Sequence, residues 1–315
     1  MALQSDKERN IMVDKDMSEH LRQLFVSARE TLRPLLPKRL RGDIPVVPVV
    51  RFSGAIGLST PLRPGVTLAG VARPLERAFG MRRARAVALL INSPGGSPVQ
   101  SHAIYRRIRQ LAEEKGVPVI AFAEDVVASG GYMIACAADE IVCDPSSIVG
   151  SIGVVGGSFG FVHLMEKLGI ERRLYTSGER KAMLDPFLPE KPDDVNRLKA
   201  VQRDIHEDFI ALVKERRGAR LVGPENDLFS GEFWTGRKAV ELGIADSIGD
   251  LRSTLRQRFG DDVVTPLVSP ARGWLGRVQP GVGATEWEGF LHRPNFAGEV
   301  ISALEARALW ARYGL

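Results

Sequence analysis

Two glycine-rich turns in the sequence have the residue types needed for acyl-transfer chemistry. They lie at residues 92–97 and 128–132, and each follows an apolar run typical of a strand and opens a helical pattern. A strand that turns into a helix at glycine leaves backbone N–H groups unpaired and aimed at one point, where the helix dipole favours negative charge. Such a turn can hold an oxyanion, although each turn alone is equally typical of a tight structural connection.

Ser129 is the candidate nucleophile, because it lies on the second turn at the start of an apolar helix. The alternative interpretation is an N-cap serine with a purely structural role. A nucleophilic serine needs a base, which is usually a histidine. The five histidines lie in charged helical contexts, on polar faces, at a helix start or near the end of the chain, and none is predicted as the partner: His20, His102, His163, His206 and His292.

Lys181 is the other candidate base. A lysine can accept a proton when burial lowers its pKa from about 10.4 toward neutrality, because desolvation disfavours the charged form. Lys181 follows a predicted strand at 173–175 and precedes the apolar residues Ala182, Met183 and Leu184. A surface lysine is the alternative interpretation of the same pattern.

The elements that position these residues alternate between strand and helix patterns, which predicts an α/β fold. Strands are expected at 46–52, 86–91, 117–122, 140–143 and 173–175, and helices at 98–115, 130–138, 160–168, 192–217 and 237–242. The charge-free run 145–162 is nearly long enough to span a membrane, but it starts at a proline and is broken by five glycines. We predict strand and loop there.

An amphipathic helix is expected before this core at 17–36, and its use on a membrane surface, on the protein body or on a sister subunit stays open. After about Asp262 the pattern loosens into prolines and glycines and becomes helical again at 295–313. We therefore divide the chain into an N-terminal extension (1–43), a catalytic domain (44–262) and a linker with a terminal helix (263–315).

The composition is that of an ordinary globular protein, with 44% hydrophobic and 26% charged residues among 315. The 43 basic and 38 acidic residues leave a net charge of +5, too small an excess to indicate nucleic-acid binding. Cys136 and Cys143 have no partners at metal-ligand spacing, so we predict buried free thiols. The first sixteen residues do not resemble a secretory signal, so a cytoplasmic location is expected, with membrane association on the cytoplasmic face left open.

Five motifs in order along the chain carry a resemblance to a known family. They are Ser93-Pro94-Gly95-Gly96, Ala128-Ser129-Gly130-Gly131-Tyr132, Gly150-Ser151-Ile152-Gly153-Val154, Ser177-Gly178 through Lys181, and Trp234-Thr235-Gly236 with Ala239, Leu242-Gly243 and Asp246. Over residues 87–249, roughly half of the chain, the sequence resembles the signal peptide peptidase family of SppA, or protease IV, with its SohB-like relatives.

The resemblance implies a fold and a set of site residues. The fold would be the ClpP/crotonase-like α/β superhelix of repeated β-β-α units. Ser129 would be the nucleophile and Lys181, 52 positions later, the base. Gly130 and either Gly95 or Gly96 would supply oxyanion N–H groups, and Ser151 would orient the lysine amine.

The resemblance also implies a reaction and an assembly. The chain would be a serine endopeptidase of apolar or unstructured peptides, with remnant signal peptides as one candidate substrate and no metal or cofactor required. Short members of the family assemble into homo-oligomeric rings whose active sites are shared between protomers. Many members begin with a transmembrane anchor, whereas this sequence begins with charged residues and an amphipathic helix.

Two other functions stay open at this stage. The Clp proteases resemble this chain in the serine turn, but they use a histidine roughly two dozen residues beyond it, and none occurs around Val154. A crotonase-like enzyme acting on acyl-CoA has the same architecture and two glycine turns. The other is a catalytically silent protein that keeps only the ring-forming fold, and the presence of both Ser129 and Lys181 counts against it.

Overall fold

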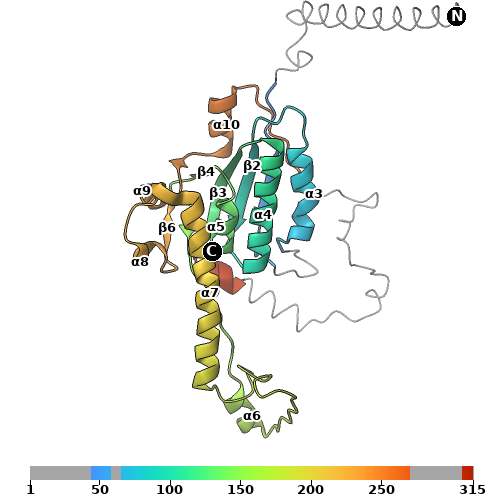
Figure 1. Ribbon diagram of the computed structural model, residues 1–315, viewed down its shortest axis with the longest axis vertical. Helices are drawn as coiled ribbons and strands as arrows, with labels where there is room; N and C mark the ends of the chain where they lie inside the picture. Colours follow the sequence, from blue (N-terminus) through green and yellow to red (C-terminus); the bar gives the residue numbers. More distant parts are fainter. Residues whose placement is uncertain (1–43, 58–64, 270–306, 315) are drawn as a thin grey trace, which may run out of the picture.

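The protein folds around a mostly parallel sheet in the order β1-β2-β3-β4-β7, with β5 and β6 attached at the far end of β3. The computed structural model describes residues 44–57, 65–269 and 307–314 (Figure 1). The strands are β1 (Val49–Ser53), β2 (Val87–Ser93), β3 (Val119–Ala128), β4 (Glu140–Cys143), β5 (Ile148–Gly150), β6 (Phe233–Thr235) and β7 (Ser247–Ile248). The predicted α/β class is confirmed.

Helices cover the sheet on both faces, and one of them extends away from it (Figure 1). They are α3 (Leu68–Phe79), α4 (Pro98–Lys115), α5 (Gly130–Ala135), α6 (Val162–Leu168), α7 (Pro192–Arg217), the short 3₁₀ helix η2 (Gly218–Arg220), α8 (Glu225–Leu228), α9 (Gly236–Glu241) and α10 (Leu251–Phe259). Helix α4 packs between α3 and α5, and α5 also packs on β2 and β3. Leu255 of α10 packs on the other face, where Val47 and Val142 are buried.

Helix α4 has the bounds that the sequence predicts, because its ends are strongly marked. Ser97 is the N-cap and accepts a hydrogen bond from the Gln100 N–H, and Pro98 occupies the first helical position. Gly116 ends the helix in the left-handed conformation with φ 62°. Residues such as Ile104 then bury one face of α4 against the sheet, which fixes the turn just before it.

Strand β3 changes partners along its length and thereby positions the second glycine turn. On one side, residues 120–123 pair with β4 and residues 126–128 pair with β5, whereas β2 lies on the other side throughout. The side chain of Asn92 joins the ends of β2 and β3, because it accepts from Val126 N–H at 3.2 Å and donates to Asp125 at 2.7 Å. The two strands therefore end side by side.

Helix α7 starts far from the sheet and packs on the body only through its second half. Its buried residues are Phe209, Leu212, Val213 and Arg217. Its 26 residues span about 39 Å, and α6 lies near the distant end (Figure 1). We call residues 156–202 the arm.

The structure corrects several predicted elements. Residues 173–175, predicted as a strand, are an exposed loop on the arm and pair with none of the described strands. The helix predicted at 130–138 ends at Ala135, and the helices at α3, α8 and α10 were not predicted. The predicted helix at 17–36 lies outside the described residues, and of the one at 295–313 only residues from 307 onward are described.

Cys136 and Cys143 are buried free thiols, as predicted. Burial raises the pKa of Cys136 to about 12 and that of Cys143 to about 11, so neither is a ready nucleophile. The hydrogen-bonded body continues to Val268, because Val47 N–H donates to Val264 at 2.9 Å and Val268 N–H to Val49 at 2.8 Å. Among helices in the described ranges, none has the length and apolar character needed to cross a membrane.

Candidate active site

Ser129 lies between β3 and α5 in a backbone conformation that serine rarely adopts. Its φ is 51° and its ψ is −122°. The Ser129 N–H donates to the Gly150 carbonyl at 2.8 Å, and the Ser129 carbonyl accepts from Met133 N–H at 3.0 Å. The side chain makes no N-cap hydrogen bond. The structure therefore gives the Ser129 hydroxyl no capping role.

The two glycine turns touch each other, as their positions after neighbouring parallel strands require. Gly95 has φ 100°, and a Cβ atom there would lie 2.7 Å from the Ser129 Cβ and 2.9 Å from the Gly130 nitrogen. Gly96 has φ 142°, and a Cβ atom there would overlap the carbonyl oxygen of Ile56. Both positions need glycine because the backbones approach so closely.

Two backbone N–H groups beside Ser129 are unused within the described residues. Gly95 donates to the Ser93 hydroxyl at 3.2 Å. Neither Gly96 nor Gly130 donates a hydrogen bond in the part of the chain that the structure describes. Of the two candidates in the first turn, Gly96 is thus the one with a free donor.

A cavity of about 310 Å³ opens beside Ser129, whose side chain is partly exposed there. Its walls come from both turns, from the segment after β5 and from a helix near the end of the chain: Ile56, Gly57, Pro94, Gly96, Ser97, Pro98, Ser129, Gly153, Val154, Val155, Leu309 and Arg312. Most of these residues are apolar or glycine. The cavity therefore offers room for an apolar side chain next to the hydroxyl.

Ser151 lies directly beside Ser129, because it follows the Gly150 carbonyl to which Ser129 donates. It is buried, has φ 53°, and donates its N–H to the Glu232 carbonyl at 2.7 Å. Trp234 of β6 packs on Gly150, where a Cβ atom would lie 2.8 Å from the indole ring. β6 therefore supports the backbone on which Ser151 and Ser129 rest.

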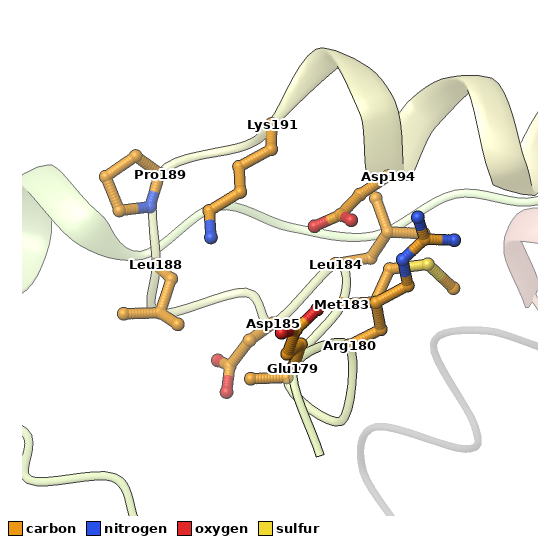
Figure 2. A pocket seen from close by; sticks show the side chains of 10 residues that line it. Glu179, Arg180, Met183, Leu184, Asp185, Leu188, Pro189, Lys191 and Asp194 are labelled. Atoms are coloured by element: carbon orange, nitrogen blue, oxygen red, sulfur yellow. The ribbon is translucent and has the colours of Figure 1, made fainter. Parts of the chain in front are cut away.

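Lys181 does not meet Ser129 within one chain. Its side chain is exposed, and the turn that carries it lies on the arm near the start of α7. That turn and the start of α7 enclose a cavity of about 60 Å³. Its lining residues, drawn as sticks in Figure 2, are Glu179, Arg180, Ala182, Met183, Leu184, Asp185, Leu188, Pro189, Lys191 and Asp194. Lys181 lines neither this cavity nor the one at Ser129.

The length of α7 sets the separation of the two residues. His206 of α7 lies 3.0 Å from the Ile152 carbonyl, next to Ser151. Between Lys191 and His206 the helix rises about 20 Å. The turn with Lys181 is therefore separated from the Ser129 cavity by most of the arm.

Sequence reasoning missed three contributors to the site. His206 was considered only as a base, and its contact with the Ile152 carbonyl has no signal in the local sequence. Leu309 and Arg312 line the cavity although about 180 residues separate them from Ser129. No spacing rule relates such distant segments, so only the fold could place them.

Residues 111–259 match the model of peptidase family S49. The chain carries a peptidase family S49 domain. This confirms the predicted resemblance to the SppA and SohB-like serine peptidases. The S49 domain contains Ser129, Ser151 and Lys181, whereas Gly95 and Gly96 precede the matched residues.

Relatives of this chain are named after an antiporter in one case and a serine protease in another. The chain is 54% identical over 289 residues to a Brucella abortus protein named Na(+)/H(+) antiporter NhaA, a match that covers 90% of the chain and 39% of that protein. It is 30% identical over 221 residues to the Arabidopsis thaliana chloroplastic serine protease SPPA, covering 67% of the chain and 32% of that protein. The chain thus spans well under two thirds of the length of either relative.

A solved structure of a 1510-N membrane-bound stomatin-specific protease mutant aligns with 72% of the chain and 99% of its own length, at 15% identity and a TM-score of 0.42.

Proposed function

We propose that the chain is a serine endopeptidase in which Ser129 is the nucleophile and Lys181 of a neighbouring subunit is the general base. The observation that carries this proposal is the environment of Ser129. Its hydroxyl is free of a capping role and opens on a cavity, and beside it lie two N–H groups that have no acceptor among the described residues. The match to a peptidase family favours peptide hydrolysis over acyl-CoA chemistry.

The reaction follows from these groups. The neutral Lys181 amine takes the Ser129 proton as Oγ adds to the scissile carbonyl carbon, and the N–H groups of Gly96 and Gly130 hold the resulting oxyanion. The lysine ammonium then gives that proton to the departing amine, which leaves an acyl-enzyme. Lys181 next takes a proton from water, whose hydroxide adds to the ester and releases the peptide acid as Ser129 is reprotonated.

The exposed apolar surface of the arm favours an active site in which Ser129 and Lys181 come from different subunits. It carries large apolar side chains that are mostly exposed in the single chain, with Tyr175 89% exposed and Phe159 78% exposed. Further exposed apolar residues of the arm are Leu164, Leu168, Ile170 and Leu174. Apolar surface of this kind marks protein interfaces, and a ring would bury it while bringing Lys181 to the next Ser129.

Ser151 is the residue we propose to orient the lysine amine. The Ser151 N–H donates a hydrogen bond to the Glu232 carbonyl, and this bond fixes Ser151 beside Ser129. A hydroxyl there would accept a hydrogen bond from the incoming amine, which aligns the lone pair of the amine with the Ser129 proton.

The apolar lining of the cavity supports apolar or unstructured peptides as substrates, with remnant signal peptides as one candidate. The Brucella relative is named an Na(+)/H(+) antiporter, and 39% of it matches this chain. We infer that the peptidase acts near the cytoplasmic face of a membrane. Hydrolysis of a signal peptide should then exceed that of a soluble peptide of equal length, and equal rates would contradict this choice of substrate.

A serine-reactive fluorophosphonate tests the catalytic proposal. The wild type, Ser129→Ala and Lys181→Ala would be treated alike, and the intact mass of each protein measured alongside hydrolysis of an unfolded casein. We expect labelling and hydrolysis in the wild type alone. Lys167→Ala, another lysine of the arm, is the control and should behave as the wild type.

Labelling of Ser129→Ala to the wild-type extent would remove Ser129 as the nucleophile. Wild-type activity in Lys181→Ala would leave the nucleophile in place but overturn the assignment of the base.

A further inference from the structure

A segment near the end of the chain is anchored against both glycine turns. Tyr313 is only 6% exposed and is buried with Val126 and Ala128, the residues that lead into Ser129. Its ring meets Phe233 of β6 edge to face at a centroid distance of 5.1 Å. Its hydroxyl lies 3.5 Å from the Pro94 carbonyl, at the first turn. Residues 307–314 are drawn in red beside the sheet in Figure 1.

This anchor presents two side chains to the cavity at Ser129. Leu309 and Arg312 both line it, and Arg312 is the one charged residue among its lining residues. The guanidinium is exposed and has no ion-pair or hydrogen-bond partner within the described residues, its nearest ring contact being that of Tyr313 at 6.0 Å. Among the described residues, a positive charge without a counter-charge therefore stands at the edge of an otherwise apolar and hydroxyl-lined cleft.

We infer that Arg312 is a specificity-determining residue that favours peptides with an aspartate or glutamate close to the scissile bond. This inference rests on the proposed peptidase function, because it makes the cavity the substrate cleft. A carboxylate in the cleft would receive charge-assisted hydrogen bonds from the guanidinium, whereas a basic side chain would be repelled. The neighbouring apolar walls would hold the side chain adjacent to the acidic one.

Charge in an exposed position has a modest effect on affinity. Exposed pairs of this kind change an equilibrium constant by about twofold to fivefold, and salt screens them. The expected signature is therefore a preference that is small, specific to Arg312 and weakened by salt.

Binding to a Ser129→Ala protein tests the inference without requiring turnover. Two fluorescent peptides identical except for one glutamate or glutamine would be compared by anisotropy, in proteins that also carry Arg312→Gln or Arg307→Gln. Arg307 is an exposed arginine of the same segment that does not line the cavity, which makes it a matched control. We expect about threefold tighter binding of the glutamate peptide, lost in Arg312→Gln and kept in Arg307→Gln.

Cleavage measurements distinguish failure of the inference about Arg312 from failure of the proposed peptidase function. In proteins that retain Ser129, the ratio of kcat/KM for the two peptides should fall to one in Arg312→Gln and should decline in the wild type at 0.5 M salt. Tyr313→Ala should also lose the preference, because it frees the anchor while keeping the charge. A wild type that cleaves both peptides equally would overturn the inference while the peptidase function stands. A wild type that binds the peptides and cleaves neither would overturn the function, and with it the inference that rests on it.

Discussion

Ser129 is held at a positive φ by its neighbours and not by its own preference. Side chains disfavour this region by about 1–2 kcal/mol, so the surrounding structure must impose it. The Gly150 carbonyl takes the Ser129 N–H, and Gly95 leaves space for the Ser129 Cβ. The conformation directs the hydroxyl away from the helix it precedes and toward the cavity.

Gly95→Ala should therefore impair the reactivity of Ser129, the proposed nucleophile, more than it impairs folding. The added methyl would lie 2.7 Å from the Ser129 Cβ, so the serine turn must shift. Gly116→Ala is the control, because it has a similar positive φ of 62° and nothing within 4 Å. We expect a loss of about 1 kcal/mol of stability for Gly116→Ala with normal fluorophosphonate labelling, and at least tenfold slower labelling for Gly95→Ala. Normal labelling of Gly95→Ala would contradict the close-contact argument.

Asp246 and Arg217 form a buried pair whose charge makes stability depend on pH. Burial raises the pKa of Asp246, but hydrogen bonds from Arg217 and the Ile141 N–H, with the charges of Arg217 and Arg220, outweigh it and hold the pKa below its ordinary value. The stabilisation is therefore present above about pH 4 and is lost as the pH falls through the folded-state pKa.

Asp246→Asn should cost about 3 kcal/mol in the free energy of unfolding at pH 7, because it leaves Arg217 buried without a counter-charge. Urea unfolding at several pH values would measure this cost. The difference from the wild type should narrow as the pH falls from 5 toward 3. A difference that stays constant over this range would show that the carboxylate charge is not its source.

At the residue scale, the sequence predicted both glycine turns and the type of chemistry they favour. It left the choice between Gly95 and Gly96 open, since two adjacent glycines have the same local signature. The fold distinguishes them, because the Gly95 N–H donates a hydrogen bond to the Ser93 hydroxyl.

Helix α7 connects the body to the arm and also supports the cleft. His206 contacts the Ile152 carbonyl at 3.0 Å, and the chain then continues through Val154 and Val155 along the cavity. An imidazole N–H at this position donates to the carbonyl whether the ring is neutral or charged. We regard His206 as a positioning residue for this segment of the cleft.

His206→Ala should raise KM about fivefold or more with a smaller change in kcat, because a carbonyl loses its donor and the cleft wall loosens. His206→Gln keeps an N–H donor and should restore much of the affinity. His102→Ala, an exposed histidine of α4, is the control. Equal KM values in His206→Ala and the wild type would show that the contact is dispensable.

Element bounds were predictable where caps and composition agreed. The 192–217 helix begins at a proline and ends before Gly218, so its bounds matched the prediction. Strand β5 lies in the run 145–162, where strand and loop are predicted. Strands β6 and β7 have only three and two residues, too few for a period of two to be recognised. The predicted strand at 173–175 shows the reverse error, since β-forming residues on a projecting loop have no partner strand.

Ser129 and Lys181, the two candidate catalytic residues, are separated within one chain by most of the arm. A shared active site predicts that two inactive variants complement each other. Ser129→Ala and Lys181→Ala subunits, unfolded together at equal amounts and refolded, should regain about a quarter of the wild-type activity, because one interface in four pairs an intact serine with an intact lysine. The separately refolded variants are the control. No recovery in a mixed oligomer would show that each chain supplies its own base.

The sequence alone could not have located the cavity at Ser129. Its walls combine segments around residues 56, 96, 129, 154 and 309. Each segment is ordinary in isolation, and their meeting depends on sheet order and on the burial of Tyr313.

The support of Ser151 by the Glu232 carbonyl has a consequence for synthesis of the protein. The backbone beside Ser129 is completed only when β6 pairs with β5, about 100 residues after Ser129 has left the ribosome. Contacts between such distant segments form late in folding. A nascent or truncated chain that ends before β6 therefore carries Ser129 without the Glu232 carbonyl that fixes Ser151 beside it.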